Sequence, residues 1–433
     1  MTEIQRMLLE EFGEQKIKFT EEYFEKYGTD WYKEIKPDPL AIFFPESESD
    51  LKKVVLFANK RNQPIVVSGG RTGLCGGATA ANKELIVSLE KMNKIEWSDE
   101  KKQVVCEAGA ITDVVKDFAD SHGRLLPISL ASSSSSSVGG NVATNAAGSK
   151  FIRYGSTKEH VARIKVLLAN GEVLTLQKEI AKDATGPNLM ELFFGSEGSL
   201  GIIFEIVFNT CEKPKFLETV LLRSDDIDAV KDHILSPEIK KCISSVEYWD
   251  ENCQTLIGDS PEKKYFIVIE LVSQSEQELE NCLEILAEKG LNIALLNSKQ
   301  AKEIWDKRED LPVILADKGA YKMDVSLPLN ELSSFLDKIK NLESKEIYSF
   351  GHLGDGNIHV NIVSPLKQSE LVASSYKLLK ECKGSPSAEH GIGQRKKDIW
   401  TEFIEYQDKY KLLKTLKKSM DPKNILSPKV FFD

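Results

Sequence analysis

The sequence lacks the features that mark several large protein classes. Its seven cysteines among 433 residues are scattered and form no C-x-x-C pair, which argues against a disulfide framework and a thiolate zinc site. It has no run of about 18 apolar residues, so we expect no membrane span. The N-terminal stretch has acids within its apolar pattern and no small-residue cleavage site, unlike a signal peptide. We therefore expect a reducing, cytoplasmic location.

The chain also has fewer basic than acidic residues. The 57 Lys and Arg against 67 Asp and Glu leave a net charge of −10. Such a surface repels nucleic acid and anionic membranes, so we expect neither as a partner. An anionic substrate would have to be attracted by a local basic pocket. With 433 residues, 41% of them hydrophobic, the chain should form two or three packed units.

Hydrophobic periodicity gives a coarse picture of the first half. It predicts an amphipathic helix over 1–27 and a second helix over 47–60, with a start signal at Ser49-Asp50. A short buried strand is predicted at 64–68. Two further strands, 164–168 and 172–176, are joined by Asn170-Gly171, the typical signal of a hairpin.

Glycine is concentrated in three segments, 69–77, 139–148 and 195–201. Glycine lets backbone N–H groups approach a ligand closely and form anion-binding nests. The first segment follows a predicted strand but fits neither G-x-G-x-x-G nor G-x-x-x-x-G-K-[ST]. One such loop is as often a tight turn as a ligand loop, whereas three favour a large phosphate-bearing cofactor. The serine run 132–137 could be a linker, although its flanks favour packing against a planar ring.

Two histidine-bearing clusters, 352–361 (HLGDGNIHVN) and 387–395, stand out in the last third. Residues seven apart on one strand face opposite ways, but the turn at 354–356 resets that phase, so His352 and His359 can converge. With Glu389 they would form the ligand set of an open zinc, manganese or iron site. These histidines could equally be hydrogen-bonded core residues, and the residues alone leave both interpretations open.

The glycine segments resemble the FAD-binding loops of the vanillyl-alcohol oxidase/p-cresol methylhydroxylase family. The similarity lies in 68–77 (SGGRTGLCGG), 138–148 (VGGNVATNAAG) with Arg153-Tyr154-Gly155, and 192–202 (LFFGSEGSLGI). Within that family, the match is to the branch of FAD-linked D-2-hydroxyglutarate, D-lactate and glycolate dehydrogenases. It extends from about residue 37 to the C-terminus.

The resemblance implies an α+β fold in three parts. A helical segment, 1–36, would precede a two-subdomain PCMH-type FAD-binding domain, 37–214. An α+β C-terminal FAD-linked oxidase domain, 215–433, would carry the substrate and metal sites, and its last part would return to the FAD domain.

FAD is the implied cofactor. Its expected contacts are Ser68, Gly69, Gly70, Arg71, Thr72, Gly73, Leu74, Gly77, Ser135, Gly139, Gly140, Thr144, Gly148, Tyr154, Glu197, Gly201, Ile202 and Asn424. Some relatives bond FAD covalently through a loop histidine or cysteine. This chain has no histidine in 69–77 and has Ser136 where relatives can carry cysteine. Non-covalent FAD is therefore implied.

The resemblance also assigns roles in the second half. His352, His359 and Glu389 would bind a divalent metal, with zinc as the first candidate. Asn361 and His390 would face the substrate, with His390 as general base. Arg308, in WDKRE, and Lys322, in YKMDVSLP, would bind carboxylate, although taken alone both would be read as solvated positions. Pro312 stands where relatives carry a substrate-binding hydroxyl residue.

The implied reaction is oxidation of a D-2-hydroxy acid to the 2-oxo acid, with metal assistance and hydride transfer to flavin N5. D-2-hydroxyglutarate is favoured and D-lactate comes next. Alternatives are a glycolate oxidase-type subunit, a non-catalytic flavin-binding subunit, or a zinc-dependent hydrolase if no flavin binds. A separate electron acceptor is expected, either an electron-transferring flavoprotein, a quinone-linked subunit or a cytochrome.

Overall fold

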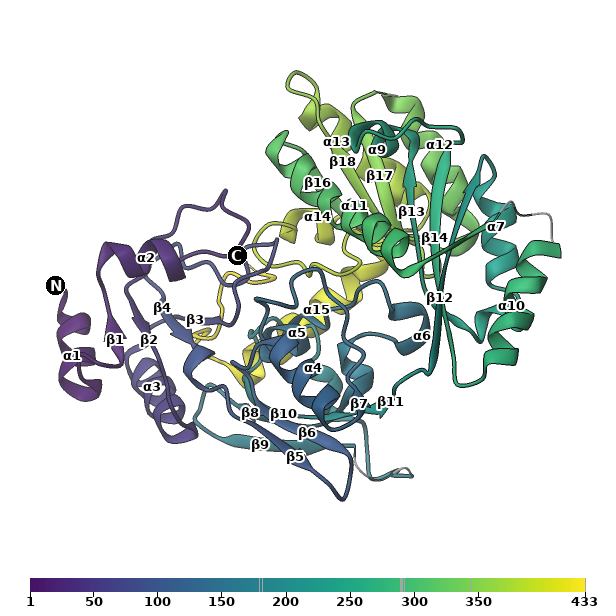
Figure 1. Cartoon of the computed structure of the whole chain (residues 1–433). Helices are drawn as coiled ribbons and strands as arrows, with labels where there is room; N and C mark the ends of the chain where they lie inside the picture. Colours follow the sequence, from purple (N-terminus) through teal and green to yellow (C-terminus); the bar gives the residue numbers. More distant parts are fainter. Residues whose placement is uncertain (179, 181, 289–290, 292, 344, 433) are drawn as a thin grey trace. The chain divides into compact units, whose positions relative to one another are not determined.

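The computed structural model describes residues 1–432 except 179, 181, 289–290, 292 and 344. The chain divides into two compact units, shown in Figure 1. Unit 1 comprises Met1–Ala146, Ser156–Glu212 and His390–Asp433, and unit 2 comprises Ala147–Gly155 and Lys213–Glu389. Helices and sheets are mixed in both units, as the α+β expectation required. The domain limits given above stay predictions.

Unit 1 contains a four-stranded sheet in the order β1-β2-β4-β3. Its central pairs β2–β4 and β3–β4 are parallel, and β1 adds an antiparallel edge. The strands are β1 (Ile17–Lys18), β2 (Ala41–Phe43), β3 (Ile65–Ser68) and β4 (Leu85–Ser88). β3 confirms the strand predicted before the first glycine segment. The C-terminal segment adds a parallel bridge to it, between Ile65 and Leu426.

A second, antiparallel sheet of unit 1 has the order β5-β6-β10-β8-β9. Its strands are β5 (Ile95–Ser98), β6 (Gln103–Glu107), β8 (Val161–Leu167), β9 (Val173–Gln177) and β10 (Ile202–Asn209). The pair β8–β9 confirms the predicted hairpin, and a short ladder joins β7 (Arg124–Leu125) to β11 (Cys211–Glu212). The helices are α1 (Glu3–Phe12), α2 (Glu21–Tyr27), α3 (Glu48–Arg61), α4 (Thr112–Ser121), α5 (Val138–Thr144), α14 (Lys397–Thr401) and α15 (Gln407–Met420).

One helix prediction in unit 1 is wrong, and a second is confirmed except for its capping residue. The single helix expected over 1–27 is broken, because Gly13 ends α1 at a φ of +78° and β1 intervenes before α2. A positive φ suits glycine and stops a right-handed helix. The helix predicted over 47–60 is confirmed as α3, although its N-cap is Ser47 and not Ser49, since the Ser47 side chain accepts from the Asp50 N–H.

Unit 2 is built on one antiparallel sheet in the order β15-β12-β14-β13-β17-β18-β16 (Figure 1). Its strands are β12 (Phe216–Ser224), β13 (Ile243–Asp250), β14 (Tyr265–Ser273), β15 (Ile293–Leu296), β16 (Tyr321–Ser326), β17 (Ile347–His352) and β18 (Asn357–Ile362). Its helices are α6 (Phe151–Tyr154), α7 (Ile227–Ile234), α8 (Pro237–Lys240), α9 (Glu251–Leu256), α10 (Glu276–Glu288), α11 (Ser298–Asp317), α12 (Leu332–Leu342) and α13 (Gln368–Glu381).

The core of unit 2 explains why charged groups on this sheet matter. All eight residues of β13 are buried, and Trp249, Phe266, Val268, Leu311 and Phe350 belong to one apolar cluster. A charge placed on such a strand needs a partner, because burial of an unpaired charge is costly. Glu247 lies on this strand, so its carboxylate is expected to have a charged or hydrogen-bonding partner. Among the described residues, no helix has the length and apolarity that crossing a membrane requires.

Candidate active site

The register of four neighbouring strands gathers polar side chains on one face of the unit 2 sheet. His359 of β18 lies opposite Asp324 of β16 and Phe350 of β17. His352 of β17 lies opposite both Asn357 and Glu247. Directly opposed residues in antiparallel strands project to the same face. The sheet thus places both histidines and two carboxylates together.

The hairpin between β17 and β18 behaves as the sequence predicted. Gly356 adopts a φ of +78° in the turn, and a Cβ there would lie 2.3 Å from the Leu327 carbonyl oxygen. The His352 and His359 ring centroids lie 5.4 Å apart. The expected convergence of the two histidines is confirmed.

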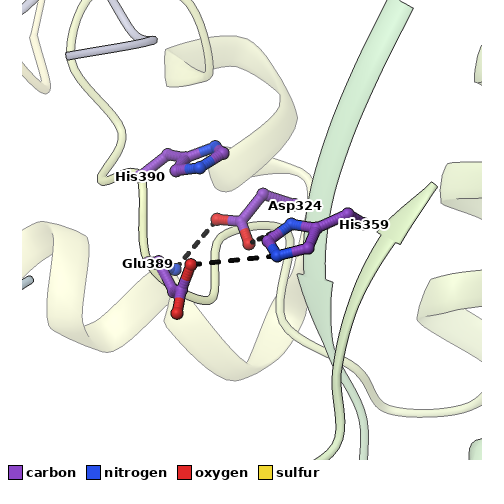
Figure 2. A group of neighbouring side chains, drawn as sticks. All are labelled: Asp324, His359, Glu389 and His390. Carbon is purple, nitrogen blue, oxygen red and sulfur yellow. Dashed lines mark hydrogen bonds and ion pairs between the residues drawn. The ribbon is translucent and has the colours of Figure 1, made fainter. Parts of the chain in front are cut away.

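Four side chains form a group that could hold a metal ion, namely Asp324, His359, Glu389 and the next residue in the chain, His390 (Figure 2). One ligand atom from each lies within 4.8 Å of all the others. His359 Nε2 is 4.0 Å from Glu389 Oε2, and His359 Nδ1 is 3.6 Å from Asp324 Oδ1. Two imidazoles and two carboxylates are donors that zinc, manganese and iron all accept.

Hydrogen bonds of Asp324 order this group, and Figure 2 shows the one to the Glu389 backbone. Asp324 is buried, and its Oδ2 accepts the Glu389 backbone N–H at 2.8 Å. Its Oδ1 accepts from the Asn357 side chain at 2.9 Å. Asp324 therefore joins β16, β18 and the Glu389 segment through one carboxylate.

His352, expected to be a ligand, lies beside this group, although the four-residue group does not include it. Its Nε2 is 3.2 Å from Glu389 Oε1, and its Nδ1 contacts Glu247 Oε1. Burial alone would lower the pKa of His352, but the carboxylates of Glu247 and Glu389 raise it well above its usual value. Burial raises the pKa of the Glu389 carboxyl against the opposing effect of His352.

The expected substrate residues Arg308, Lys322 and Asn361 come from α11, β16 and β18. Arg308 is buried and stacks on the Phe350 ring, with Cζ 4.5 Å from its centroid. Lys322 and Asn361 are directly opposed in the ladder, and the Lys322 ammonium donates to the Pro312 carbonyl at 2.9 Å. Both Lys322 and Asn361 thus lie on the face that carries His359.

The parts of the three glycine segments that belong to unit 1 are joined to one another. The Gly70 N–H donates to Ser137 Oγ at 3.2 Å, and the Glu197 N–H donates to the Ala143 carbonyl at 2.8 Å. A Cβ on Gly70 would lie 2.2 Å from the Ser135 carbonyl oxygen, and one on Gly139 would lie 2.4 Å from the Ala108 Cβ. These close backbone approaches leave no room for a side chain.

Unsatisfied polar atoms near this junction are consistent with a ligand. Among the described residues, the buried Ser68 and Ser427 hydroxyls have no hydrogen-bond partner. Ser68 ends β3, and the Ser427 N–H donates to Ile65 of the same strand at 2.7 Å. Buried hydroxyls without partners are uncommon. The three glycine segments with Ser68 and Ser427, called the glycine cradle below, therefore fit a nucleotide cofactor.

The remaining expected FAD contacts have varied local settings. Arg71, at a φ of +60°, folds back to donate to the Gly69 carbonyl and stacks on Tyr27. Thr144 Oγ1 donates to the Gly140 carbonyl, Asn424 has a φ of +51°, and Ile202 starts β10. Gly148 and Tyr154 lie in the 147–155 segment of unit 2.

Two residues of the candidate site had no role in the sequence-based prediction, Asp324 and Glu247. Asp324 stands two residues after Lys322, so period-two alternation could have placed them on one face. Glu247 has a subtler signal, a carboxylate flanked by the strand-forming residues Val246 and Tyr248. Neither signal shows which residues Asp324 and Glu247 contact, because those contacts depend on the strand register.

Comparison with known proteins finds a family match for each half of the chain. Residues 39–177 match the model described as FAD binding domain, and 213–430 match that of FAD linked oxidases, C-terminal domain. The chain belongs to the FAD-linked oxidase family. It is therefore an FAD-dependent oxidoreductase, as the sequence predicted, and the alternative of a hydrolase without flavin is wrong.

Full-length relatives agree with this assignment. D-2-hydroxyglutarate dehydrogenase of Stutzerimonas stutzeri (strain A1501) is 32% identical, over 94% of both chains. The mitochondrial enzyme of that name from Arabidopsis thaliana is also 32% identical, over 96% of this chain and 79% of its own. A structure of p-cresol methylhydroxylase with substrate bound matches the fold with a TM-score of 0.79 and 16% identity, covering 100% of this chain and 98% of that one. The predicted PCMH-type fold is confirmed.

Proposed function

We propose that this enzyme oxidises the CH–OH group of D-2-hydroxyglutarate to the 2-oxo acid. The observation that carries the proposal is the imidazole–carboxylate group of Asp324, His359, Glu389 and His390 in a chain of the FAD-linked oxidase family. The names of its relatives support the substrate. FAD, when bound, would accept the Cα hydride at N5.

Substrate binding is assigned to the cationic side chains of unit 2. The Arg308 contacts with Glu247 use Nε and Nη2 of a guanidinium that has five N–H donors. The substrate's carboxylate would accept from the guanidinium in a fixed orientation, which is the positional part of catalysis. Lys322, opposite Asn361, supplies a second cation for the distal carboxylate. Two cations suit a dicarboxylic acid.

His390 is proposed as the general base that removes the hydroxyl proton. The segment after it is held from both sides within unit 1. The Glu197 carboxylate accepts the N–H groups of Ile392 and Gly393, and the Cys75 thiol donates to the Gly391 carbonyl at 3.3 Å. This bracing limits the backbone freedom of the residue that carries the base.

A divalent metal would be held by His359 and Glu389, with His352 as the third proposed ligand and zinc as the first candidate. When bound, it would act as a Lewis acid that lowers the pKa of the substrate hydroxyl. Asn361, two residues from His359 on the same face, would hydrogen-bond the substrate.

We propose that FAD is bound without a covalent link. The Ser136 hydroxyl is hydrogen-bonded to Thr112 Oγ1 at 2.8 Å and is buried, and a serine hydroxyl lacks the nucleophilicity of the cysteine that some relatives use. Trichloroacetic acid precipitation should therefore release all flavin absorbance into the supernatant. Flavin that stays with the pellet would contradict this.

D-Lactate is the second candidate because of Pro312. A proline offers no hydroxyl, and its carbonyl already engages the Lys322 ammonium. If that contact holds Lys322 away from a distal carboxylate, a monocarboxylate would fit better. The expected separate electron acceptor and the cytoplasmic location stay predictions.

Anaerobic flavin spectra of the purified protein test the proposal. We expect D-2-hydroxyglutarate to bleach the oxidised flavin band and to give the highest kcat/KM with an artificial dye, ahead of D-lactate and glycolate. The L-enantiomer is the matched control and should leave the spectrum unchanged. A yellow protein that no 2-hydroxy acid bleaches would instead support a non-catalytic flavin-binding subunit.

A further inference from the structure

Glu247 carries a buried carboxylate, 1% exposed, with both oxygens engaged. Its Oε1 contacts His352 Nδ1. Its Oε2 accepts from Arg308 Nε at 3.0 Å and lies 2.8 Å from Arg308 Nη2. One side chain therefore connects a proposed metal ligand with a proposed substrate-binding residue.

The contact with His352 has a directional consequence. A carboxylate accepts hydrogen bonds and cannot donate them when ionised, so it selects the imidazole that carries hydrogen on Nδ1. With a metal bound, the neutral ring would offer its lone pair at Nε2, the atom that lies on the side of Glu389, 3.2 Å from its Oε1. Carboxylates that hold histidine ligands in this way orient the ring and raise its basicity toward a metal.

The contact with Arg308 also fixes geometry. The guanidinium is clamped between the Glu247 carboxylate and the Phe350 ring. Phe350 in turn lies beside His359, with ring centroids 5.1 Å apart. A planar guanidinium held at its Nε edge and on its face has little rotational freedom left.

We propose that Glu247 is a positioning residue that sets His352 toward the metal and Arg308 toward the substrate carboxylate at the same time. It contacts neither the substrate nor the metal. The inference rests on the proposed function, because it assigns the two partners of Glu247 to metal and substrate binding.

The same strand offers a matched control. Asp250 is a second buried carboxylate on β13, and it accepts from the Ser349 N–H and hydroxyl at 2.9 Å each. No contact joins Asp250 to His352 or Arg308 in the described part of the chain. Asp250→Asn thus removes a buried negative charge from the same strand without touching the proposed positioning role.

The first measurement is zinc affinity, from competition with a chromogenic chelator in the full chain with flavin bound. Glu247→Gln keeps the side-chain volume but can no longer accept from both partners. We expect zinc binding to weaken by roughly 10- to 100-fold, the range typical for loss of such a partner. Asp250→Asn should bind zinc as the wild type does.

The second measurement is the KM for D-2-hydroxyglutarate with an artificial dye. Loss of the clamp on Arg308 should raise KM by about tenfold, and the oxidised flavin spectrum should stay unchanged. If Glu247→Gln does not fold, Glu247→Asp serves instead. It retains the charge but is one methylene too short to reach both partners, so the same two losses are expected.

The outcomes separate this inference from the proposed function. Wild-type zinc affinity and KM in a folded Glu247 variant would overturn the positioning role alone, as would equal losses in Asp250→Asn. A wild-type chain that binds zinc but oxidises no 2-hydroxy acid would overturn the proposed function, and the zinc measurement would still decide the role of Glu247 toward His352. A wild-type chain that binds no zinc would overturn the metal part of both.

Discussion

The glycine cradle of unit 1 and the polar face of unit 2 are built by opposite means. The cradle consists of backbone groups, held together by close approaches such as that of Gly70 to the Ser135 carbonyl. The polar face consists of side chains from separate strands, such as Asp324 and His359, brought together by register. In the sequence, a site made of backbone groups appears as short runs rich in glycine. The residues of a site made of side chains are instead spread along the chain. The two sites should therefore fail independently under mutation.

The largest effect should come from His390. We expect His390→Ala to lower kcat by about 10²- to 10⁴-fold, the contribution typical of a general base, while the protein stays yellow. Steady-state rates with D-2-hydroxyglutarate and flavin absorbance provide the test. His122→Ala, which removes an exposed ring stacked on Trp97, should retain wild-type turnover. Near wild-type activity in His390→Ala would refute the assignment of the base.

Removal of a proposed metal ligand should weaken metal binding at the polar face of unit 2 without affecting flavin binding at the glycine cradle. We expect His359→Ala to weaken zinc binding by more than about 100-fold, beyond the range for partners outside the coordination sphere, with unchanged flavin content. Chelator competition and flavin absorbance measure both. His233→Ala, in α7, removes a ring that contacts the Ala229 carbonyl of its own helix and should change neither quantity. Unaltered zinc affinity in His359→Ala would exclude this histidine as a ligand.

Overpacking the cradle should have the converse effect. A Cβ on Gly70 meets three backbone atoms of the serine segment within 2.9 Å. At about 1–3 kcal/mol for such strain, Gly70→Ala should bind FAD roughly 10- to 100-fold more weakly. Zinc affinity should persist. Gly123→Ala is the control, because its Cβ meets open space and only its φ of +72° adds strain. Full flavin retention in Gly70→Ala would argue against the cradle.

The smallest effect concerns Glu197, a partly buried carboxyl. Burial raises its pKa from 4.5 to about 7, so the folded chain holds this proton more tightly than the unfolded chain does. Ionisation therefore costs stability as pH rises between these values. Relative to wild type, Glu197→Gln should gain melting temperature across that window, by about 2–4 °C per kcal/mol. The exposed Glu191→Gln should show no such trend. A difference in melting temperature between Glu197→Gln and wild type that does not change with pH would contradict the raised pKa of Glu197.

Local structure was predictable where short-range physics dominates. The strand before the first glycine segment and the β8–β9 hairpin followed from β-branched residues and Asn170-Gly171. The break at Gly13 was missed, because a single glycine in an amphipathic pattern is also tolerated within helices. The capping residue of α3 was misassigned for a related reason, since Ser47 and Ser49 both fit the capping signal.

By itself the sequence determined the family, the FAD-binding domain and the convergence of His352 with His359, because these depend on contiguous motifs and one turn. Only the tertiary structure placed Asp324 opposite His359 and Glu247 between His352 and Arg308. These pairings depend on strand order and register. They join residues 61 positions apart for Glu247 and Arg308 and 105 positions apart for Glu247 and His352. Local patterns carry no record of such long-range pairing.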